Sequence, residues 1–218
     1  SGKLPSHLLQ FSADKKPVVV WNMTQRCNLK CAHCYAQAVT DKGEDPINTE
    51  KAKVLIDDLA AYGAPVILFS GGEPTIRKDL PELASYATSK GMRAVISTNG
   101  TLIDRNMAKV LKDVGLSYVG VSLDGGEEVH DHFRGVKGSF RRALEGLEYC
   151  REEGIKVGLR FTINKRNAVE VPKIFEILRE RQIPRVCFYH LVYSGRGTEL
   201  INEDLNHQET RQIVDLIM

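Results

Sequence analysis

Three of the chain's five cysteines lie close together near its start, in the stretch CNLKCAHC (27–34). Cys27, Cys31 and Cys34 have the spacing C-x3-C-x2-C, and thiolates are soft ligands that bind zinc or iron–sulfur clusters. Four cysteines would complete either kind of site, so three leave one ligand position open. The spacing therefore predicts a metal centre with room for one further ligand.

Other interpretations of these cysteines are less well supported. An odd number of cysteines, with Cys150 and Cys187 far from the other three, is a poor disulfide framework. His33 could supply a fourth zinc ligand, but it directly precedes Cys34, and adjacent side chains rarely point into one tetrahedral shell. One short loop can instead hold three corners of a [4Fe–4S] cluster. We interpret Cys150 and Cys187 as core residues.

Glycine-rich and short polar motifs follow three further apolar segments: SGGEP (70–74), STNG (97–100) and SLDG (122–125). Glycines let the backbone approach a ligand closely, and a carboxylate beside them suits an ammonium group. Serine hydroxyls can bond the hydroxyls of a ribose. Each motif alone could equally form a plain turn. Their recurrence after successive segments predicts that they share one site.

Six apolar, β-branched segments alternate with amphipathic helical segments, a pattern typical of parallel βα units. The predicted strands are 17–24, 65–70, 93–99, 118–124, 156–164 and 185–193. The predicted helices are 48–63, 79–91, 104–115, 139–154, 169–182 and 207–218. Four consecutive strands carry the motifs at their ends, and no Gly-x-Gly-x-x-Gly turn follows the first, so a barrel is favoured over a doubly wound sheet.

The composition is that of an ordinary globular protein, with 218 residues, 42% of them hydrophobic and 27% charged. Thirty basic and 28 acidic residues leave a net charge of +2, which argues against nucleic acid or an anionic membrane as a partner. No apolar run approaches the roughly 20 residues that cross a bilayer, and no signal peptide is evident, so we expect a cytoplasmic protein. We expect an N-terminal arm at 1–16 and one domain at 17–218.

The three cysteines followed by Tyr35 resemble the motif of the radical S-adenosylmethionine (SAM) enzymes, and the similarity runs from about residue 17 to the end. The resemblance implies an α/β fold, a partial (βα)6 TIM-type barrel, in agreement with the six units. It implies a [4Fe–4S] cluster on Cys27, Cys31 and Cys34, with SAM chelating the fourth iron. An electron from a donor such as flavodoxin or ferredoxin would cleave SAM to a 5′-deoxyadenosyl radical, which abstracts a substrate hydrogen.

The resemblance also assigns the contacts to SAM. The GGEP motif would hold the methionyl ammonium, the two serine motifs would face the ribose and methionyl groups, and the tyrosine after the cysteines would flank adenine. The residues so assigned are Tyr35, Gly71, Gly72, Glu73, Pro74, Ser97, Asn99, Ser122 and Asp124.

Two arginines are expected to bind anions. The stretch HDHFRG (130–135) resembles the family's His-Asp-x-x-Arg-Gly, which assigns Arg134 to the carboxylate of SAM, since an arginine fork matches a carboxylate. A solvated arginine at a helix start is the alternative. Arg160 lies in a predicted buried strand, where an unpaired guanidinium is costly, so we expect it to point into the barrel towards an anion, and we count it among the residues that bind the cofactor. A structural salt bridge is equally compatible with Arg160.

The stretches 16–35 and 187–197 resemble radical SAM proteins that modify haem precursors, the NirJ type of haem d1 synthesis and its relatives in the siroheme-dependent haem pathway. Those enzymes act on propionate or acetate side chains of an iron tetrapyrrole. In this chain His190 would approach the macrocycle metal, Tyr189 and Tyr193 would stack on a ring, and Arg196 would pair a carboxylate. An aromatic-rich core followed by a Gly-Arg-Gly turn is the alternative.

Two other functions are compatible with parts of the pattern. The same barrel and motifs occur in peptide-modifying radical SAM maturases, which, like many NirJ-type proteins, usually carry a cysteine-rich extension that this sequence does not show. A zinc-stabilised α/β binding module without catalysis would explain the cysteines. It would leave the GGEP and serine motifs unexplained.

Overall fold

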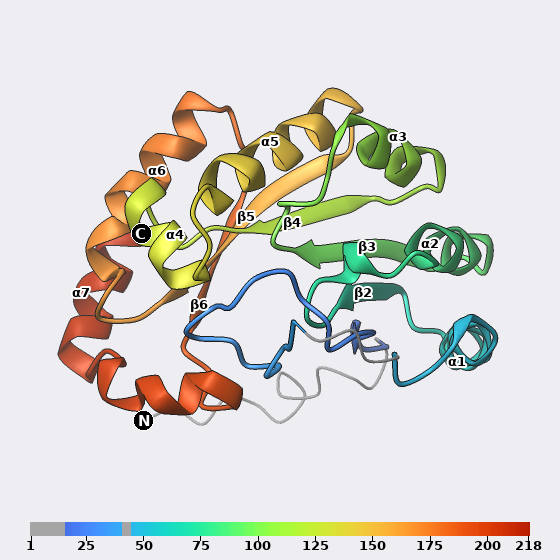
Figure 1. Cartoon of the computed structure of the whole chain (residues 1–218), viewed down its shortest axis with the longest axis horizontal. Helices are drawn as coiled ribbons and strands as arrows, with labels where there is room; N and C mark the ends of the chain where they lie inside the picture. The colour runs from blue at the N-terminus through green and yellow to red at the C-terminus, as the bar shows by residue number, and fades with distance from the viewer. Residues whose placement is uncertain (1–15, 41–44) are drawn as a thin grey trace, which may run out of the picture.

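Six parallel strands and the helices between them form an open half-barrel (Figure 1). The computed structural model describes residues 16–40 and 45–218, so the predicted arm at 1–16 lies, except for its last residue, outside the described residues. The strands follow one another in chain order from β1 to β6, and every neighbouring pair is parallel. Within the described residues no strand connects β6 back to β1, so the barrel is not closed.

All six predicted strands and all six predicted helices are found. The strands are β1 Val19–Asn22, β2 Val66–Ser70, β3 Arg93–Thr98, β4 Tyr118–Ser122, β5 Lys156–Ile163 and β6 Val186–His190. The α-helices are α1 Thr49–Tyr62, α2 Leu80–Ser89, α3 Arg105–Asp113, α4 Glu127–Arg134, α5 Ser139–Glu152, α6 Val171–Glu180 and α7 His207–Ile217. Helix α4 was not predicted, and neither were the 3-10 helices η2 Pro74–Ile76, η3 Ala168–Glu170 and η4 Gly195–Glu203.

Local sequence sets the ends of the helices. Asn48 caps α1 by accepting a hydrogen bond from the backbone N–H of Lys51 at 3.0 Å, and Gly63 ends the helix in the left-handed region at φ 86°. Asp104 caps α3 in the same way as Asn48. At the start of α7, Asn206 and Glu209 form a reciprocal capping box. These short-range bonds fix where each βα unit turns.

The two faces of the curved sheet have different compositions. Side chains of a strand alternate between faces, and the outward set, such as Phe69, Ile96 and Phe161, is fully buried under the helices. Figure 1 shows the helices along this outer side and the segment that follows β1 across the inner side. The inner set is small or polar at the carboxyl ends of the strands. The core therefore lies between sheet and helices, and the inner face is left for a site.

Helices of the described residues are too short or too polar for a membrane crossing.

Candidate functional site

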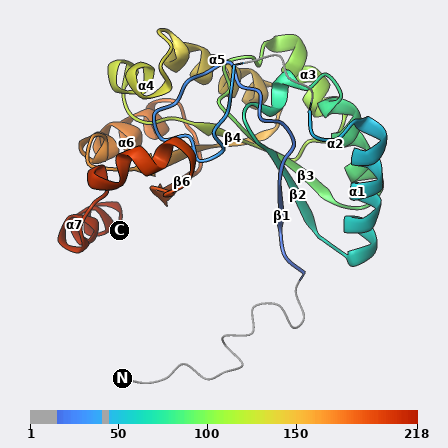
Figure 2. The ribbon, with the colours of Figure 1, turned by 60° about the horizontal axis from the view of Figure 1, so that its bottom comes forward.

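A cavity of about 240 Å³ lies on the inner face, at the carboxyl ends of the strands. The loop that carries the cysteines covers it from one side, and Figure 2 shows this segment running past β6 and the 3-10 helix η4. Most of the predicted site residues line the cavity: Cys27, Cys31, Cys34, Tyr35, Gly71, Gly72, Ser97, Asn99, Ser122, Arg134, Arg160, His190 and Arg196. Residues that are separate in the sequence are thus brought to one mouth of the barrel.

Each of the three thiols has an N–H group near its sulfur. The backbone N–H groups of Leu29 and Ala38 donate to the Sγ atoms of Cys27 and Cys34, both at 3.4 Å. Arg134 Nη1 donates to Cys31 Sγ, also at 3.4 Å. Hydrogen bonds to sulfur stabilise thiolates and set the potential of an iron–sulfur cluster. These three donors, two from the loop backbone and one from Arg134, therefore suit thiolates that bind a cluster.

Two of the three thiols are also shielded from water by apolar neighbours. Cys27 and Cys31 are buried and pack with Leu29 and Ala38. Burial raises the pKa of the Cys27 thiol to about 11 and raises that of Cys31 as well. A metal binds the deprotonated form, so binding a cluster here must release protons.

Within residues 16–40 and 45–218, no three His, Cys, Asp or Glu side chains come close enough together to hold one metal ion. A tetrahedral zinc site needs ligands that converge on one atom, whereas a [4Fe–4S] cluster takes thiolates at separate irons. His33 does not join the cysteines either, because its Nε2 faces Asp124 Oδ1 at 3.6 Å. A [4Fe–4S] cluster on the three cysteines stays a prediction at this point.

Arg196 holds the cysteine loop from the far end of the chain. Its Nε donates to the carbonyl oxygen of Cys31 at 2.8 Å, its Nη1 to that of Ala38 at 3.0 Å, and its backbone N–H to that of Cys34 at 3.0 Å. The sequence predicted a substrate carboxylate as the partner of Arg196. The structure gives its Nε and Nη1 backbone carbonyls, so the side chain clamps the loop, while its buried Nη2 has no partner among the described residues. The contact between Arg196 and a substrate carboxylate stays a prediction.

Helix α4 supports the same loop. The backbone N–H groups of Lys30 and Ala32 donate to the carbonyl oxygens of Arg134 and Phe133 at 3.0 and 2.9 Å. These two carbonyls are at the carboxyl end of the helix, where no intrahelical partner exists for them. The helix end thus finds its partners in the cysteine loop. Arg134 is the last residue of α4, so a solvated arginine at a helix start, the alternative interpretation, is wrong.

Asp124 lies behind Arg134 and does not line the cavity. Its side chain is fully buried, and its Oδ2 accepts a hydrogen bond from Arg134 Nε at 2.6 Å. Burial alone would raise the pKa of Asp124, but the charges of Arg134 and the two nearby histidines hold it below the ordinary value. A contact between Asp124 and SAM stays a prediction. What the structure shows is a buried counter-ion that orients the arginine beside the cysteines.

Glu73 is likewise buried beneath the cavity rather than exposed in it. Its carboxylate accepts hydrogen bonds from Thr75 Oγ1 at 2.6 Å, Thr98 Oγ1 at 2.7 Å and the Asn99 backbone N–H at 2.7 Å. Burial raises the pKa of Glu73, and these hydrogen bonds oppose the rise. The ammonium contact predicted for Glu73 stays a prediction. Pro74 also lies outside the lining, as the first residue of η2.

The two glycines of the GGEP motif allow the backbone of residues 24–26 to pass close to them. A Cβ atom at Gly72 would lie 2.2 Å from the carbonyl oxygen of Arg26, and one at Gly71 would lie 2.4 Å from that of Thr24. The N–H group of Gly72 donates to the carbonyl oxygen of Thr24 at 2.7 Å, and the N–H group of Glu73 donates to that of Arg26 at 2.8 Å. The sequence predicted glycines that admit a ligand. The structure shows that they also seat the start of the cysteine loop against β2.

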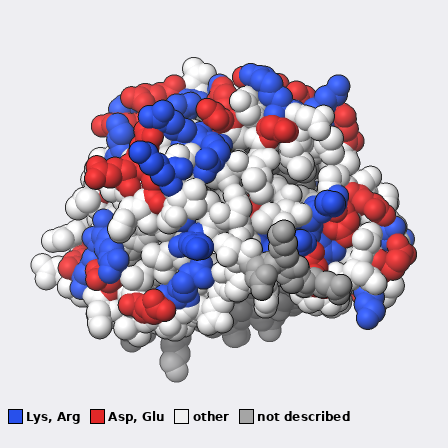
Figure 3. Space-filling view, in the orientation of Figure 1, with Lys and Arg blue, Asp and Glu red and all other residues white. Residues whose placement is uncertain are grey.

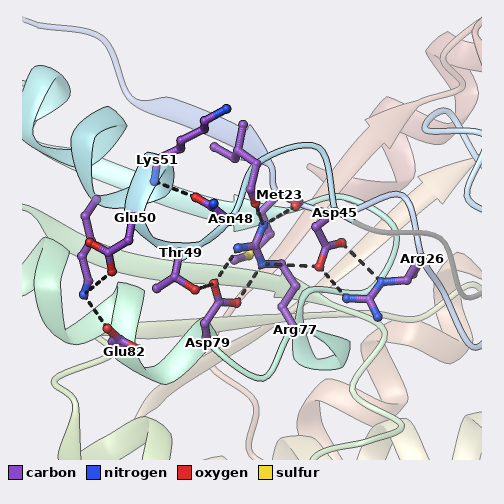
Figure 4. A network of polar contacts seen from close by, with 12 residues as sticks. Met23, Arg26, Asp45, Asn48, Thr49, Glu50, Lys51, Arg77, Asp79 and Glu82 are labelled. Atoms are coloured by element: carbon purple, nitrogen blue, oxygen red, sulfur yellow. Dashed lines mark hydrogen bonds and ion pairs between the residues drawn. The ribbon is translucent and has the colours of Figure 1, made fainter.

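A buried arginine that the sequence did not single out ties these parts together. Arg77, three residues after Pro74, pairs with Asp79 at 2.6 Å and donates to the carbonyl oxygen of Met23 at 2.9 Å (Figure 4). Asp45 lies between Arg77 and Arg26 and pairs with both. The sequence signal for Arg77 was a cation a few residues after the GGEP motif. It could not reveal the role of Arg77, because Met23 and Asp45 are distant from it in the sequence. The network fixes the entry to the cysteine loop.

The serine motifs provide the polar wall of the cavity. Ser97 and Ser122 line it, as predicted, from the ends of β3 and β4. Asn99 also lines it and donates to Asn28 Oδ1 at 2.9 Å. Tyr35 lines the cavity with 42% of its surface exposed, and its hydroxyl donates to Asn22 Oδ1 at 3.0 Å. Hydroxyl and amide groups in this position can bond a ribose or a methionyl group.

The wall formed by β5 and β6 carries the residues predicted for the substrate. Arg160, Tyr189 and His190 line the cavity, and the guanidinium carbon of Arg160 lies 4.6 Å from the centre of the Tyr189 ring. The predicted salt-bridge alternative for Arg160 is not found among the described residues, which offer it no carboxylate. Tyr193 does not line the cavity, because its hydroxyl donates to Asp204.

Charge on the outer surface is mixed. In Figure 3, lysine and arginine side chains alternate with aspartate and glutamate, and uncharged atoms cover much of the centre of this face. The largest group of basic side chains in this view lies at its upper left and has acidic side chains at its edges.

Comparison with known proteins agrees with this geometry. Residues 21–178 match the family described as the Radical SAM superfamily. The chain belongs to this superfamily. A radical SAM relative, the Fe-coproporphyrin III synthase of Methanosarcina barkeri, is 72% identical over 218 residues, which are 100% of this chain and 55% of the relative. The pre-heme d1 synthase of Dinoroseobacter shibae is 39% identical over 93% of this chain and 50% of that protein.

The fold is shared with solved radical SAM structures. The anSMEcpe structure with bound AdoMet superposes with a TM-score of 0.74 at 21% identity, over 91% of this chain and 59% of that one. This likeness confirms the predicted (βα)6 partial barrel. The chain spans about half the length of the curated relatives it matches.

Proposed function

We propose that the chain is the barrel of a radical SAM enzyme that modifies side chains of a siroheme-derived iron tetrapyrrole in haem or haem d1 synthesis. The observation that carries the proposal is the set of three thiols, each met by an N–H donor, at the mouth of a barrel whose strand ends supply serine and asparagine side chains. The 72% identity to an Fe-coproporphyrin III synthase supports the tetrapyrrole as substrate.

In this proposal Cys27, Cys31 and Cys34 hold a [4Fe–4S] cluster, which together with SAM supplies a 5′-deoxyadenosyl radical when both are bound. The residues of the chain bind and orient. Arg196 and the end of α4 fix the shape of the cysteine loop. Ser97, Ser122 and Asn99 face the ribose and methionyl part of SAM.

The other side of the cavity receives the substrate. Tyr189 offers an aromatic face for a ring of the macrocycle, and His190 stands at the rim, where it can approach the tetrapyrrole metal. We place the reaction in the cytoplasm, where thiols stay reduced, with a flavodoxin or ferredoxin as electron donor. The class of reaction is that of an oxidoreductase or a lyase.

The test is an anaerobic incubation of the full-length holoprotein with reductant, SAM and decarboxylated siroheme, followed by mass spectrometry. Loss of side-chain mass from the tetrapyrrole, with formation of 5′-deoxyadenosine, is the expected result. An unchanged tetrapyrrole, together with modification of a peptide encoded beside the protein, would favour a peptide-modifying maturase. Colourless protein with stoichiometric zinc would overturn the radical chemistry itself.

A further inference from the structure

Arg160 lies in the middle of β5, on the face of the sheet that forms the cavity. It is the register partner of Ser122 on β4 and of Cys187 on β6, and Ser122 lines the same cavity. Its strand neighbours Leu159 and Phe161 point the other way and are fully buried in the core. The sheet therefore places a cation inside the half-barrel rather than on its outer surface.

The neighbouring strands are shaped to accommodate this side chain. A Cβ atom at Gly120 would lie 2.9 Å from Arg160 Cδ and 3.3 Å from its Cγ, so the arm of the arginine occupies the space that a larger residue would need. On β6, the Tyr189 ring centre is 4.6 Å from the guanidinium carbon. A guanidinium stacked on a ring keeps the N–H groups along its edge available for a carboxylate.

Arg160 differs from the other two arginines of the cavity in its partners. Arg134 is paired with Asp124, and Arg196 donates through Nε and Nη1 to two carbonyl oxygens, although its buried Nη2 has no hydrogen-bond partner among the described residues. Among residues 16–40 and 45–218, no carboxylate is within ion-pair distance of Arg160, and its guanidinium donates no hydrogen bond. The N–H groups of a half-buried guanidinium without a counter-ion are hydrated, and a carboxylate can replace that water with charge-assisted hydrogen bonds. The charge of Arg160 is thus available to a ligand.

Two anions could reach this cation, the carboxylate of SAM and a carboxylate of the substrate. Arg134 Nη1 lies 3.4 Å from Cys31 Sγ, so Arg134 is the guanidinium that borders the place of the cluster, to which the methionyl end of SAM would bind. Arg160 stands on β5, next to Ser122 of β4, and its guanidinium lies over the Tyr189 ring of β6. The guanidinium is thus turned towards β6, the side that the proposed function gives to the tetrapyrrole, whose side chains are acetates and propionates.

We infer that Arg160, stacked on Tyr189 and seated over Gly120, forms a subsite that binds a carboxylate side chain of the substrate. The inference rests on the proposed function and adds to it the residue that anchors the tetrapyrrole. A carboxylate held at a fixed point of the wall determines which other side chain of the macrocycle faces SAM. Arg160 is therefore a specificity-determining residue.

The experiment compares Arg160→Gln and Arg160→Lys with wild type, in the full-length anaerobic holoprotein. Arg185→Gln is the matched control, because Arg185 also lies over a tyrosine, Tyr118 at 5.6 Å, but outside the cavity. Binding of decarboxylated siroheme is followed by absorbance, binding of SAM by equilibrium dialysis, and cluster content by iron analysis. The same titration is repeated with the tetrapyrrole carboxylates esterified.

We expect Arg160→Gln to weaken tetrapyrrole binding by about 10- to 100-fold, the effect of one charge-assisted bidentate contact, and Arg160→Lys to weaken it less. SAM binding, cluster content and the Arg185→Gln control should stay at the wild-type level. The esterified tetrapyrrole should bind equally to wild type and Arg160→Gln. Loss of SAM affinity with unchanged tetrapyrrole affinity would overturn the inference and give Arg160 to SAM.

Two further outcomes separate the inference from the function on which it rests. If wild type binds the tetrapyrrole and Arg160→Gln binds it equally well, the subsite is refuted and the proposed function stands. If wild type with intact cluster and normal SAM binding does not bind the tetrapyrrole, the proposed function fails and the inference fails with it.

Discussion

The two walls of the cavity differ in how their polar groups are used. On the wall formed by the cysteine loop and α4, both arginines have partners inside the protein: Arg134 pairs with Asp124, and Arg196 donates through Nε and Nη1 to loop carbonyls, although its buried Nη2 has no partner among the described residues. On the wall formed by β5 and β6, Arg160 has no anionic partner among the described residues, and His190 is exposed.

The first wall is thus held in place by internal bonds, whereas the second wall has groups that are free to bind a ligand. In the proposed function, a cluster needs ligands held in place before it arrives, and the internal bonds of the first wall provide this. In the same proposal an anionic substrate needs a charge that is still free, and Arg160 on the second wall provides it. If the comparison holds, changes to the first wall should reduce stability or cluster content, and changes to the second wall should reduce substrate binding alone.

The largest effect is expected for the ligands. Cys31→Ala, and equally Cys27→Ala or Cys34→Ala, should abolish cluster assembly and reductive cleavage of SAM while the barrel stays folded, because three thiolates are the minimum for the cluster. Iron and sulfide analysis after anaerobic reconstitution measures this. The control is Cys150→Ala, a buried cysteine of α5. A ligand variant with wild-type iron content would refute the assignment.

The next effect concerns the buried ion pair. Asp124→Asn leaves the Arg134 guanidinium buried without a counter-charge, which should lower the free energy of unfolding by about 3–5 kcal/mol. Urea unfolding of the anaerobic holoprotein measures it. Glu152→Gln, which breaks an exposed pair with Arg105, should be nearly neutral. Equal effects of the two substitutions would contradict the view that internal bonds hold the first wall in place.

A smaller effect is expected at the glycine turn. Gly72→Ala puts a methyl group 2.2 Å from the carbonyl oxygen of Arg26, so the start of the cysteine loop must move, at a cost of up to about 3 kcal/mol. Because the loop moves, the variant should also retain less of its cluster during anaerobic dialysis. The control is Gly126→Ala, where the nearest atom would be 3.4 Å away and φ is −66°. Retention that is equal in both variants would show that the glycine does not seat the loop.

The smallest effect is a pH dependence of stability. Burial, and after it the charge of Arg134, lowers the pKa of His130 to about 4, and the Asp124 N–H donates to its Nδ1 at 3.2 Å. The unfolded chain takes up the proton at a higher pH than the folded one, so stability is full above the ordinary histidine pKa of about 6.5 and decreases as the pH falls towards 4. Between pH 8 and 5 the loss from His130 is about 2 kcal/mol.

Unfolding by urea at several pH values measures this loss. Burial lowers the pKa of His33 too, which adds a loss of the same sign. The matched variant is His130→Gln, which keeps an acceptor for the Asp124 N–H but does not titrate, so the decrease should become shallower. A slope unchanged by this substitution would exclude His130 as its source.

The sequence predicted the elements of the fold well and the direction of some side chains poorly. The strands and helices follow from a repeated apolar pattern that each unit carries within itself. Helix α4 escaped prediction because its buried residues include His130 and Arg134, so it shows no apolar stripe. Its burial depends on Asp124 and the cysteine loop, which lie outside the helix.

The site was predicted as a set of residues but not as a set of contacts. Spacing alone indicated that the cysteines, the glycine turn and the serines share one mouth. It did not indicate that Glu73 turns down to Thr98 and Asn99, or that Arg196 binds the loop, since these partners are set by tertiary packing. Short motifs predict which residues lie at the site, whereas long-range hydrogen bonds determine which group each residue contacts.

The clamp of Arg196 on the cysteine loop has a consequence for the order in which the molecule is built. The bond from Arg196 to the Cys31 carbonyl joins residues 165 positions apart, and β6 must be in place before it forms. Contacts of such separation form late in folding, after the local βα units. The cysteine loop therefore takes its final shape only once nearly all of this barrel has left the ribosome. In the proposed function, this means that the cluster can bind only after the barrel around it has folded.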